Sequence, residues 1–316
     1  MLVIGYLIES MAKKSVTKST TEKKSTTKKV TPKKKTVRKA APKRSVKTPR
    51  KTKSRKQQVE SSFVLKKWMR NAIALVISIS FACLFYFIFI KPYAYRWMPC
   101  SGLKSYGVCM PYGYHVHGID ISRHQGIIDW PKLSIYREAE EPIQFIFMKA
   151  TEGGDFKDVT FDQNLSKARN EGFICGAYHF FSPRSSARKQ AQFFIQTVDL
   201  KRGDLPPVLD VEVAGKHSKN SLKDSVKVWL DAVERHYKVK PILYTSYKFK
   251  EKYLNDSVFN DYPFWIAHYY VGSVKYKGEW HFWQHTDIGE VPGIAKDVDL
   301  NVFNGTIEQL KAITMP

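Results

Sequence analysis

Acidic residues are nearly absent from the first part of this 316-residue chain. Residues 1–70 contain 23 Lys and Arg but only 3 Asp and Glu, whereas residues 71–316 contain 29 and 26. The formal net charge of +23 therefore belongs mainly to the amino-terminal segment. The remainder is nearly neutral, which argues against nucleic-acid binding as a function of the whole chain.

Aromatic residues are missing between Lys13 and Lys56, where Glu22 is the only acid. Such a segment cannot bury a core, so residues 1–65 are predicted to form a disordered basic tail. Within it, Met11 with the two lysines that follow is a more natural start than Met1. The sequence leaves three alternatives for the tail. It binds anionic lipid, it binds nucleic acid nonspecifically, or it has no partner and its charge only helps to set the membrane topology.

Motifs for nucleotides and metals are also absent. The sequence has no G-x-G-x-x-G or Walker loop, so nucleotide binding has no support. It has no H-E-x-x-H motif and no Cys/His cluster, so neither a metal nor another cofactor is expected.

Cysteine is scarce, with four residues in the chain. Cys83 lies in a long apolar run, and Cys175 lies in a strand-like apolar stretch where a small buried residue is expected. Cys100 and Cys109 bracket a short loop and are the candidate pair for a disulfide, with two free thiols as the alternative.

The one long hydrophobic run covers residues 72–90, 19 residues without a charge. At 1.5 Å per residue it spans about 28 Å, close to the hydrocarbon thickness of a bilayer. We therefore predict a transmembrane helix with its flanks at 66–91. The excess of Lys and Arg before it places the amino terminus in the cytoplasm and the rest outside, in a single-pass protein of the inner membrane with a periplasmic or otherwise extracytoplasmic domain.

After a linker predicted at 92–114, the chain alternates strand-like and helix-like segments from residue 115 to residue 316. This alternation predicts an α/β fold, either a barrel or a doubly wound sheet. Helices are expected at 162–171, 186–198 and 221–237, the last two with a serine N-cap. The expected strands cover residues 116–121, 144–150, 173–181, 207–213, 241–245, 264–268, 280–285 and 298–302.

Four acidic residues lie in or at the ends of these strands. Asp210 and Glu212 stand two apart in an apolar run, so a strand would project them from one face. Asp120 ends the first strand and Asp299 lies in the last. Carboxylates and aromatic side chains converging on one barrel mouth are typical of sugar binding and glycosidic cleavage. The alternative for the acidic pair is a solvent-facing strand end, and for each aromatic residue it is core packing.

Eight segments resemble, in order, the motifs of glycoside hydrolase family 25, the Chalaropsis-type lysozymes. The first is HGIDISRHQGIIDW at 117–130. The others are FMKATEG at 147–153, GAYHF at 176–180, LDVE at 209–212, LYT at 243–245, FWIA at 264–267, FWQ at 282–284 and VDLN at 298–301. Together they cover about residues 115–312, and eight segments in the right order are far more specific than any one of them.

This resemblance implies a modified β/α barrel of the TIM-like class and a muramidase, which cleaves the β-1,4 bond between N-acetylmuramic acid and N-acetylglucosamine. Glu212 would be the general acid. Asp210 would orient and polarise the 2-acetamido group or position water, while Asp120 and Asp299 would tune Glu212. The residues expected to line the sugar subsites are Tyr178, Tyr244, Trp265 and Gln284. No metal or organic cofactor is implied, and the stereochemistry of cleavage stays open between retention, inversion and acetamido assistance.

The leading hypothesis is a membrane-anchored muramidase that acts on peptidoglycan glycan strands of the cell's own wall. The alternative is a non-catalytic wall-binding module or wall sensor, with the basic tail binding lipid or nucleic acid. The four intact acidic positions favour the enzyme.

Overall fold

The computed structural model describes residues 66–91, 100 and 102–316. The chain divides into two compact units near residue 92, and each is described by itself. The predicted tail at 1–65 and the stretch 92–99 of the predicted linker lie outside the described residues.

The first unit contains one long apolar helix. α2 (Lys67–Phe85) continues without a break into a π-helical turn, η2 (Tyr86–Ile90). The helix Lys67–Ile90 has 24 residues and contains an 18-residue window with a mean hydropathy of 2.7, and none of its residues is buried by the rest of the protein. By length and composition this helix is able to cross a membrane. It begins five residues before the predicted apolar run because Lys67, Trp68 and Arg70 add a first, amphipathic turn.

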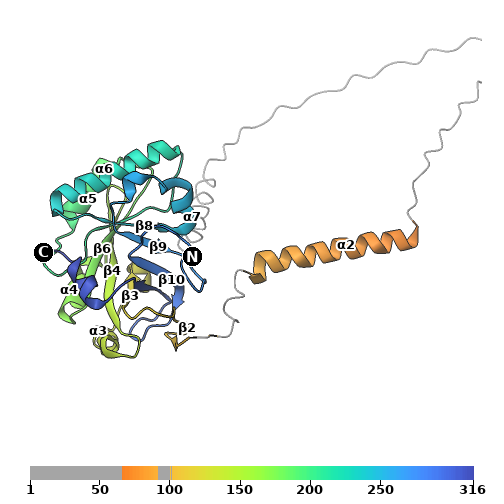
Figure 1. The fold of residues 1–316 in the computed structure, drawn as a ribbon, viewed down its shortest axis with the longest axis horizontal. Helices are drawn as coiled ribbons and strands as arrows, with labels where there is room; N and C mark the ends of the chain where they lie inside the picture. The colour runs from red at the N-terminus through yellow and green to blue at the C-terminus, as the bar shows by residue number, and fades with distance from the viewer. Residues whose placement is uncertain (1–65, 92–99, 101) are drawn as a thin grey trace, which may run out of the picture. The chain divides into compact units, whose positions relative to one another are not determined.

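The second unit is a closed barrel of eight strands (Figure 1). Each expected strand is present, within a few residues of its predicted ends. The strands are β3 (His117–Ile121), β4 (Ile143–Glu152), β6 (Ile174–Phe180), β7 (Val208–Asp210), β8 (Ile242–Ser246), β9 (Phe264–Ala267), β10 (Phe282–Gly289) and β11 (Val298–Phe303). A ninth strand, β5 (Phe156–Lys157), is short and pairs with the end of β4.

The sheet closes because β3 pairs with both β4 and β11, which decides between the barrel and the doubly wound sheet. Six of the eight neighbouring pairs are parallel, whereas β11 runs antiparallel to both β10 and β3. This reversal brings the first residues of β11, rather than its last, to the end of the barrel where the parallel strands finish.

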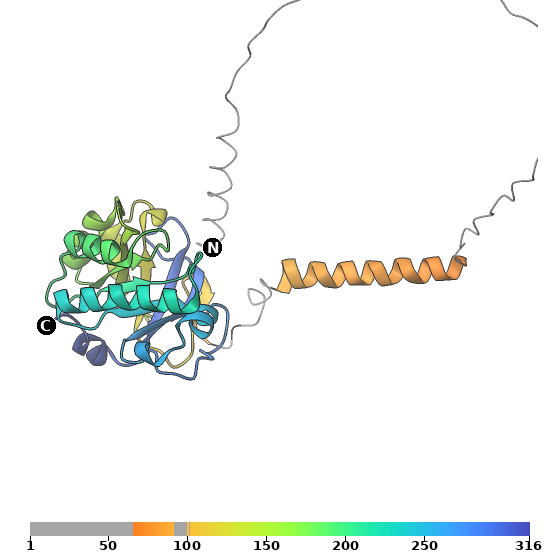
Figure 2. The same cartoon turned by 90° about the horizontal axis from the view of Figure 1, so that it is seen from above.

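Helices surround the barrel (Figures 1 and 2). Two of them, α5 and α6, pack side by side. α5 begins after the predicted cap Ser186, but α6 is capped by Ser218 and not by the predicted Ser221, so it starts two residues earlier than expected. The α-helices are α3 (Trp130–Ser134), α4 (Phe161–Asn170), α5 (Ala187–Thr197), α6 (Lys219–Tyr237), α7 (Tyr247–Phe249) and α8 (Ile307–Ala312). Shorter turns are η4 (Arg123–Gln125), η5 (Ile135–Glu138), η6 (Lys250–Leu254) and η7 (Ser257–Phe259).

Aromatic rings fill the inside of the barrel. Phe147 stacks on Trp265 with ring centroids 4.4 Å apart, and Phe145 and Phe147 both contact Phe282 edge-on. Two glycines make room for these rings. A Cβ added to Gly118 would lie 2.4 Å from the Phe145 ring, and one added to Gly176 would lie 2.5 Å from Phe147. The interior is therefore a packed core and not a channel.

A hairpin before the barrel forms part of the same unit. β1 (Lys104–Ser105) and β2 (Val108–Cys109) are joined by Tyr106 and Gly107, both with positive φ. Tyr106 is buried, donates its hydroxyl to the Glu141 carbonyl at 2.5 Å and accepts the Glu290 amide at 2.8 Å. Tyr106 and Met110 of the predicted linker are thus packed into the core of the barrel unit.

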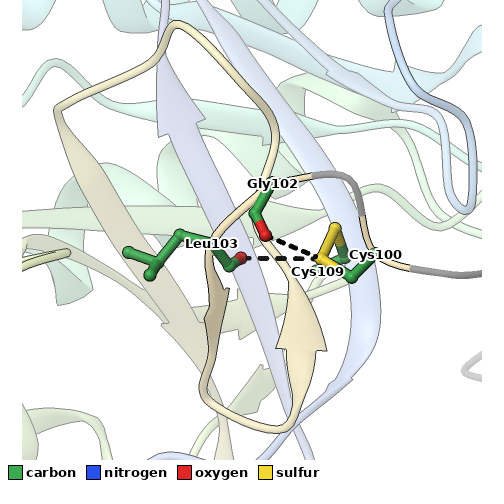
Figure 3. Close-up of a disulfide and its surroundings, with 4 residues drawn as sticks. All are labelled: Cys100, Gly102, Leu103 and Cys109. Carbon is green, nitrogen blue, oxygen red and sulfur yellow. Dashed lines mark hydrogen bonds between the residues drawn. A yellow bond between two sulfur atoms is a disulfide. The ribbon is translucent and has the colours of Figure 1, made fainter.

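The hairpin is closed by a disulfide between Cys100 and Cys109, the pair suggested by the sequence (Figure 3). The carbonyl oxygens of Gly102 and Leu103 lie 3.2 and 3.8 Å from Cys100 Sγ. A disulfide sulfur carries no proton, so we treat these as close contacts and not as hydrogen bonds. Of the other cysteines, Cys175 is buried as expected and Cys83 lies in the apolar helix.

Candidate active site

The four predicted acidic residues gather at one end of the barrel. Asp120 near the end of β3 is the register partner of Asp299 at the start of β11. Asp210 ends β7, and Glu212 follows two residues later, beyond the strand. The sequence places Glu212 inside a longer strand; the structure ends that strand at Asp210, although the Val211 amide still bonds to the Tyr244 carbonyl at 3.0 Å.

Gln284 on β10 is the centre of a buried hydrogen-bond network. Its side-chain oxygen accepts the hydroxyls of Tyr244 at 2.7 Å and Tyr269 at 2.6 Å. Its Nε2 donates to Asp120 Oδ2 at 2.6 Å. Both ends of one amide are thus used, which fixes the orientation of Gln284.

Asn301 on β11 holds the same carboxylate from the other side. Its Nδ2 donates to Asp120 Oδ2 at 2.8 Å, and its Oδ1 accepts the Trp265 indole N–H at 2.8 Å. Trp265 is 2% exposed, so its ring supports this network from within the barrel and offers no free face at the surface.

Glu212 joins the network through Tyr244, whose single hydroxyl proton is shared between Gln284 Oε1 at 2.7 Å and Glu212 Oε1 at 3.3 Å. Burial raises the pKa of Glu212 above its ordinary value, while the bond from Tyr244 and the charge of Lys149 lower it. The net direction is upward. A carboxyl group with a raised pKa keeps a proton nearer to neutral pH, as a general acid requires.

The other three carboxyls also hold protons more tightly than usual. Burial raises the pKa of Asp120 to about 7, opposed by the bonds from Asn301 and Gln284. The pKa values of Asp210 and Asp299 are raised well above the ordinary value, first by burial and then by the charges of Glu212 and Asp120, respectively. These carboxyls therefore cannot all be ionised at once near neutral pH.

All the predicted sugar-subsite residues lie in or beside this network. Tyr178 is buried among the aromatic rings of the barrel, and burial followed by the charges of Asp120 and Asp210 raises the pKa of its hydroxyl. Tyr244 and Gln284 are also buried. In this arrangement Tyr244 and Gln284 bond directly to acidic groups, and Trp265 bonds to Asn301, which holds Asp120. The roles assigned to them in sugar binding stay predictions.

No group of three or more His, Cys, Asp or Glu side chains is placed to hold a metal ion in the described part of the chain.

Comparison with known proteins decides which family has this site. The model of the family described as "Glycosyl hydrolases family 25" matches residues 119–294, from β3 to the loop before β11. The chain belongs to this family. It is therefore a glycoside hydrolase of the lysozyme type.

The region that this chain shares with its family 25 relatives covers most of the length of each relative. The "Uncharacterized protein YegX" of Escherichia coli strain K12 is 45% identical over 225 residues, which cover 71% of this chain and 80% of that protein. "Lysozyme M1" of Streptomyces globisporus is 32% identical over 213 residues, covering 63% and 71%. A solved family 25 glycosyl hydrolase from Bacillus anthracis shares 32% identity, covers 64% of this chain and 94% of that one, and superposes with a TM-score of 0.58.

Several family 25 site residues were not predicted as site residues. Asn301 and Tyr269 complete the network around Asp120 and Gln284, and Lys149 and Glu152 lie at the same end of the barrel. Asn301 was within reach of prediction because it alternates with Asp299 on the same strand. Tyr269 follows the end of β9, and no strand pattern there predicts where its side chain points.

Proposed function

We propose that the barrel is a peptidoglycan N-acetylmuramidase that hydrolyses the β-1,4 bond between N-acetylmuramic acid and N-acetylglucosamine. Membership of family 25 supports a glycosidic substrate, and lysozymes and an N,O-diacetylmuramidase are among the relatives. The observation that carries the proposal is the carboxyl pair at the end of β7, in which Asp210 is buried and Glu212 is half-buried and bonded to Tyr244.

In this proposal Glu212 is the general acid that protonates the departing glycosidic oxygen. Asp210 orients and polarises the 2-acetamido group of the substrate or positions water. Asp120 and Asp299 tune Glu212 by charge, and Asp120 does so through its fixed bonds to Gln284 and Asn301. Glu212 retains its proton because its environment disfavours the ionised form of the carboxyl group.

We further propose that Lys67–Ile90 anchors the enzyme in the inner membrane, with the amino terminus inside and the barrel outside. The helix is long and apolar enough for this, and Lys66, Lys67 and Arg70 lie at its amino-terminal end, on the side expected to stay in the cytoplasm. The Cys100–Cys109 disulfide favours an oxidising compartment for the barrel. An anchored hydrolase acts on wall near its own membrane, which favours remodelling of the cell's own peptidoglycan.

The activity is tested with the detergent-solubilised full chain and purified peptidoglycan. Wild-type protein is expected to release fragments with reducing N-acetylmuramic acid ends, identified by mass spectrometry after borohydride reduction. Glu212→Gln keeps the size of the side chain but has no proton to give, so the rate should fall by about 10²–10⁴-fold. Release of reducing N-acetylglucosamine ends would contradict the assigned bond. Binding to the wall without release by either protein would favour the wall-binding module.

The anchor is tested by fractionation and by protease access in intact spheroplasts. The full chain should sediment with membranes at high salt, and added protease should remove the barrel while the tail stays protected. Deleting residues 67–90 should release the protein from membranes. A full chain that is washed off by salt would mean surface adhesion through basic residues.

A further inference from the structure

A β-bulge places an ion pair at the acidic end of the barrel. On β4, Lys149 pairs with Tyr178 of β6, but the next partner, His179, pairs with Thr151, so Ala150 is an extra residue. Side chains at i and i+3 of a regular strand point to opposite faces. The extra residue removes that difference, and bulges often serve to redirect side chains at functional sites.

The packing of the neighbouring residues confirms this change of face. Phe145 and Phe147 belong to the cluster inside the barrel, as does Tyr178, the partner of Lys149. Ala150 belongs to the outer core. Thr151 bonds to His179, whose ring stacks on Trp229 of that outer core. Lys149 and Glu152 therefore both project from the inner face, where a regular strand would have turned Glu152 outward.

The two side chains hold each other firmly. Lys149 is 7% exposed, and its Nζ lies 2.7 Å from Glu152 Oε2 and 4.7 Å from the centre of the Phe180 ring. Phe180 is the register partner of both Glu152 on β4 and Asp210 on β7. The strand that carries Phe180, β6, thus lies between β4 and β7, and its Phe180 ring separates the Lys149–Glu152 pair from the strand that ends in Asp210.

Asp210 needs a positive charge nearby. Its Oδ1 is buried and has no hydrogen-bond partner within the described ranges, and an ionised carboxylate in that position is costly without a compensating charge. We propose that Lys149, clamped by Glu152 and Phe180, is the positioning residue that lets Asp210 carry a negative charge beside Glu212. This inference rests on the proposed function of that pair.

Lys149 and Glu152 have opposite effects on the pKa values at the acidic pair, because their charges are opposite. Lys149 lowers the pKa of both Asp210 and Glu212, whereas Glu152 raises that of Asp210. Removing the lysine should move the titration of the pair to higher pH, and removing the glutamate should move it to lower pH. The other titratable groups that face Asp210, Glu212 or Lys149 are Asp120, Asp299, Tyr244, Tyr269, Tyr178, His124 and His179.

The test is the pH dependence of kcat/KM for the solubilised full chain on soluble peptidoglycan fragments. Lys149→Met should shift both limbs upward by about one pH unit. Lys149→Arg, which keeps the charge, should restore the wild-type limbs. Glu152→Gln should shift the acidic limb downward. Lys157→Met removes an exposed ion pair to Asp162 and serves as the matched control, with no shift.

Lower activity in Lys149→Met with unmoved limbs would show a purely structural role and overturn the proposal. If that variant does not fold, the direction of the Glu152→Gln shift decides. Infrared titration of the carboxyl groups, with Asp210→Asn to identify the Asp210 band, gives the same answer without activity. A wild-type protein that cleaves nothing would refute the muramidase function, while an unmoved Asp210 band in Lys149→Met or Glu152→Gln would refute the role of Lys149.

Discussion

At the scale of single residues, the site depends on the side-chain amide of Gln284, which makes three hydrogen bonds to other site residues. Gln284 accepts two tyrosine hydroxyls and donates to Asp120, so it links the acid on β3 to the tyrosine that reaches Glu212. Any change in one member is therefore expected to alter the pKa values of the others, because buried networks are coupled.

Tyr244→Phe removes the hydroxyl that donates to Glu212. That bond lowers the pKa of Glu212, so its loss should raise this pKa further and move the basic limb of the pH–rate profile upward, by up to about one unit. Tyr269→Phe is the matched control because Tyr269 bonds to Gln284 and not to Glu212. Equal shifts in both variants would mean that the effect travels through Gln284 alone.

The sequence predicts the acidic residues well because strand ends are visible in it, but it does not predict the network. Asp120, Asp210 and Asp299 follow from strand alternation and from the convergence of strand ends at a barrel mouth. Lys149 and Glu152 do not, because a one-residue bulge reverses the face and nothing in the sequence of β4 marks Ala150 as the extra residue. The burial of Trp265 could not be predicted from the sequence either, because aromatic side chains occur both in protein cores and in sugar-binding sites.

At the scale of elements, the eight barrel strands were predictable from short apolar runs bounded by polar residues. The hairpin at Lys104–Cys109 was not, because two-residue strands have too few positions to show alternation. The backbone of its turn nevertheless identifies the turn type. Tyr106 and Gly107 both adopt positive φ, as a two-residue type I′ hairpin turn requires.

Tyr106→Ala tests whether the hairpin belongs to the folded barrel. The side chain is 7% exposed, and its loss removes a ring from the outer core together with the bond to Glu141. We expect the free energy of unfolding to fall by about 3 kcal/mol in chemical denaturation. Tyr112→Ala, at a side chain that is 94% exposed, should change it by less than about 0.5 kcal/mol. Equal effects would place the hairpin outside the cooperative unit.

At the scale of the whole molecule, four carboxyls with raised pKa values make stability depend on pH. The folded carboxyls bind more protons than the unfolded ones, so their contribution to stability is full below about pH 4 and is lost as pH rises through the folded pKa, about 7 for Asp120. Burial lowers the pKa values of His117, His179 and His285, which oppose this contribution as pH falls below about 6.5. The contribution of one carboxyl is therefore isolated by comparing a variant with the wild type.

Thermal unfolding of the solubilised full chain at pH 5 and pH 8 checks this expectation. Relative to wild type, the Tm of Asp120→Asn at pH 8 minus its Tm at pH 5 should be higher by roughly 3 °C or more, because the amide does not ionise. Asp261→Asn, at an exposed carboxylate, is the control and should keep the wild-type slope. A wild-type slope in Asp120→Asn would contradict the raised pKa of Asp120.

The aromatic filling of the barrel also determines how a polymer can be handled. Phe145, Phe147, Trp265 and Phe282 close the interior, so nothing can be threaded through it. In the proposed function a glycan strand therefore arrives and leaves at the end of the barrel where the acidic residues lie. Passage of a free chain end through the barrel is no part of such a reaction.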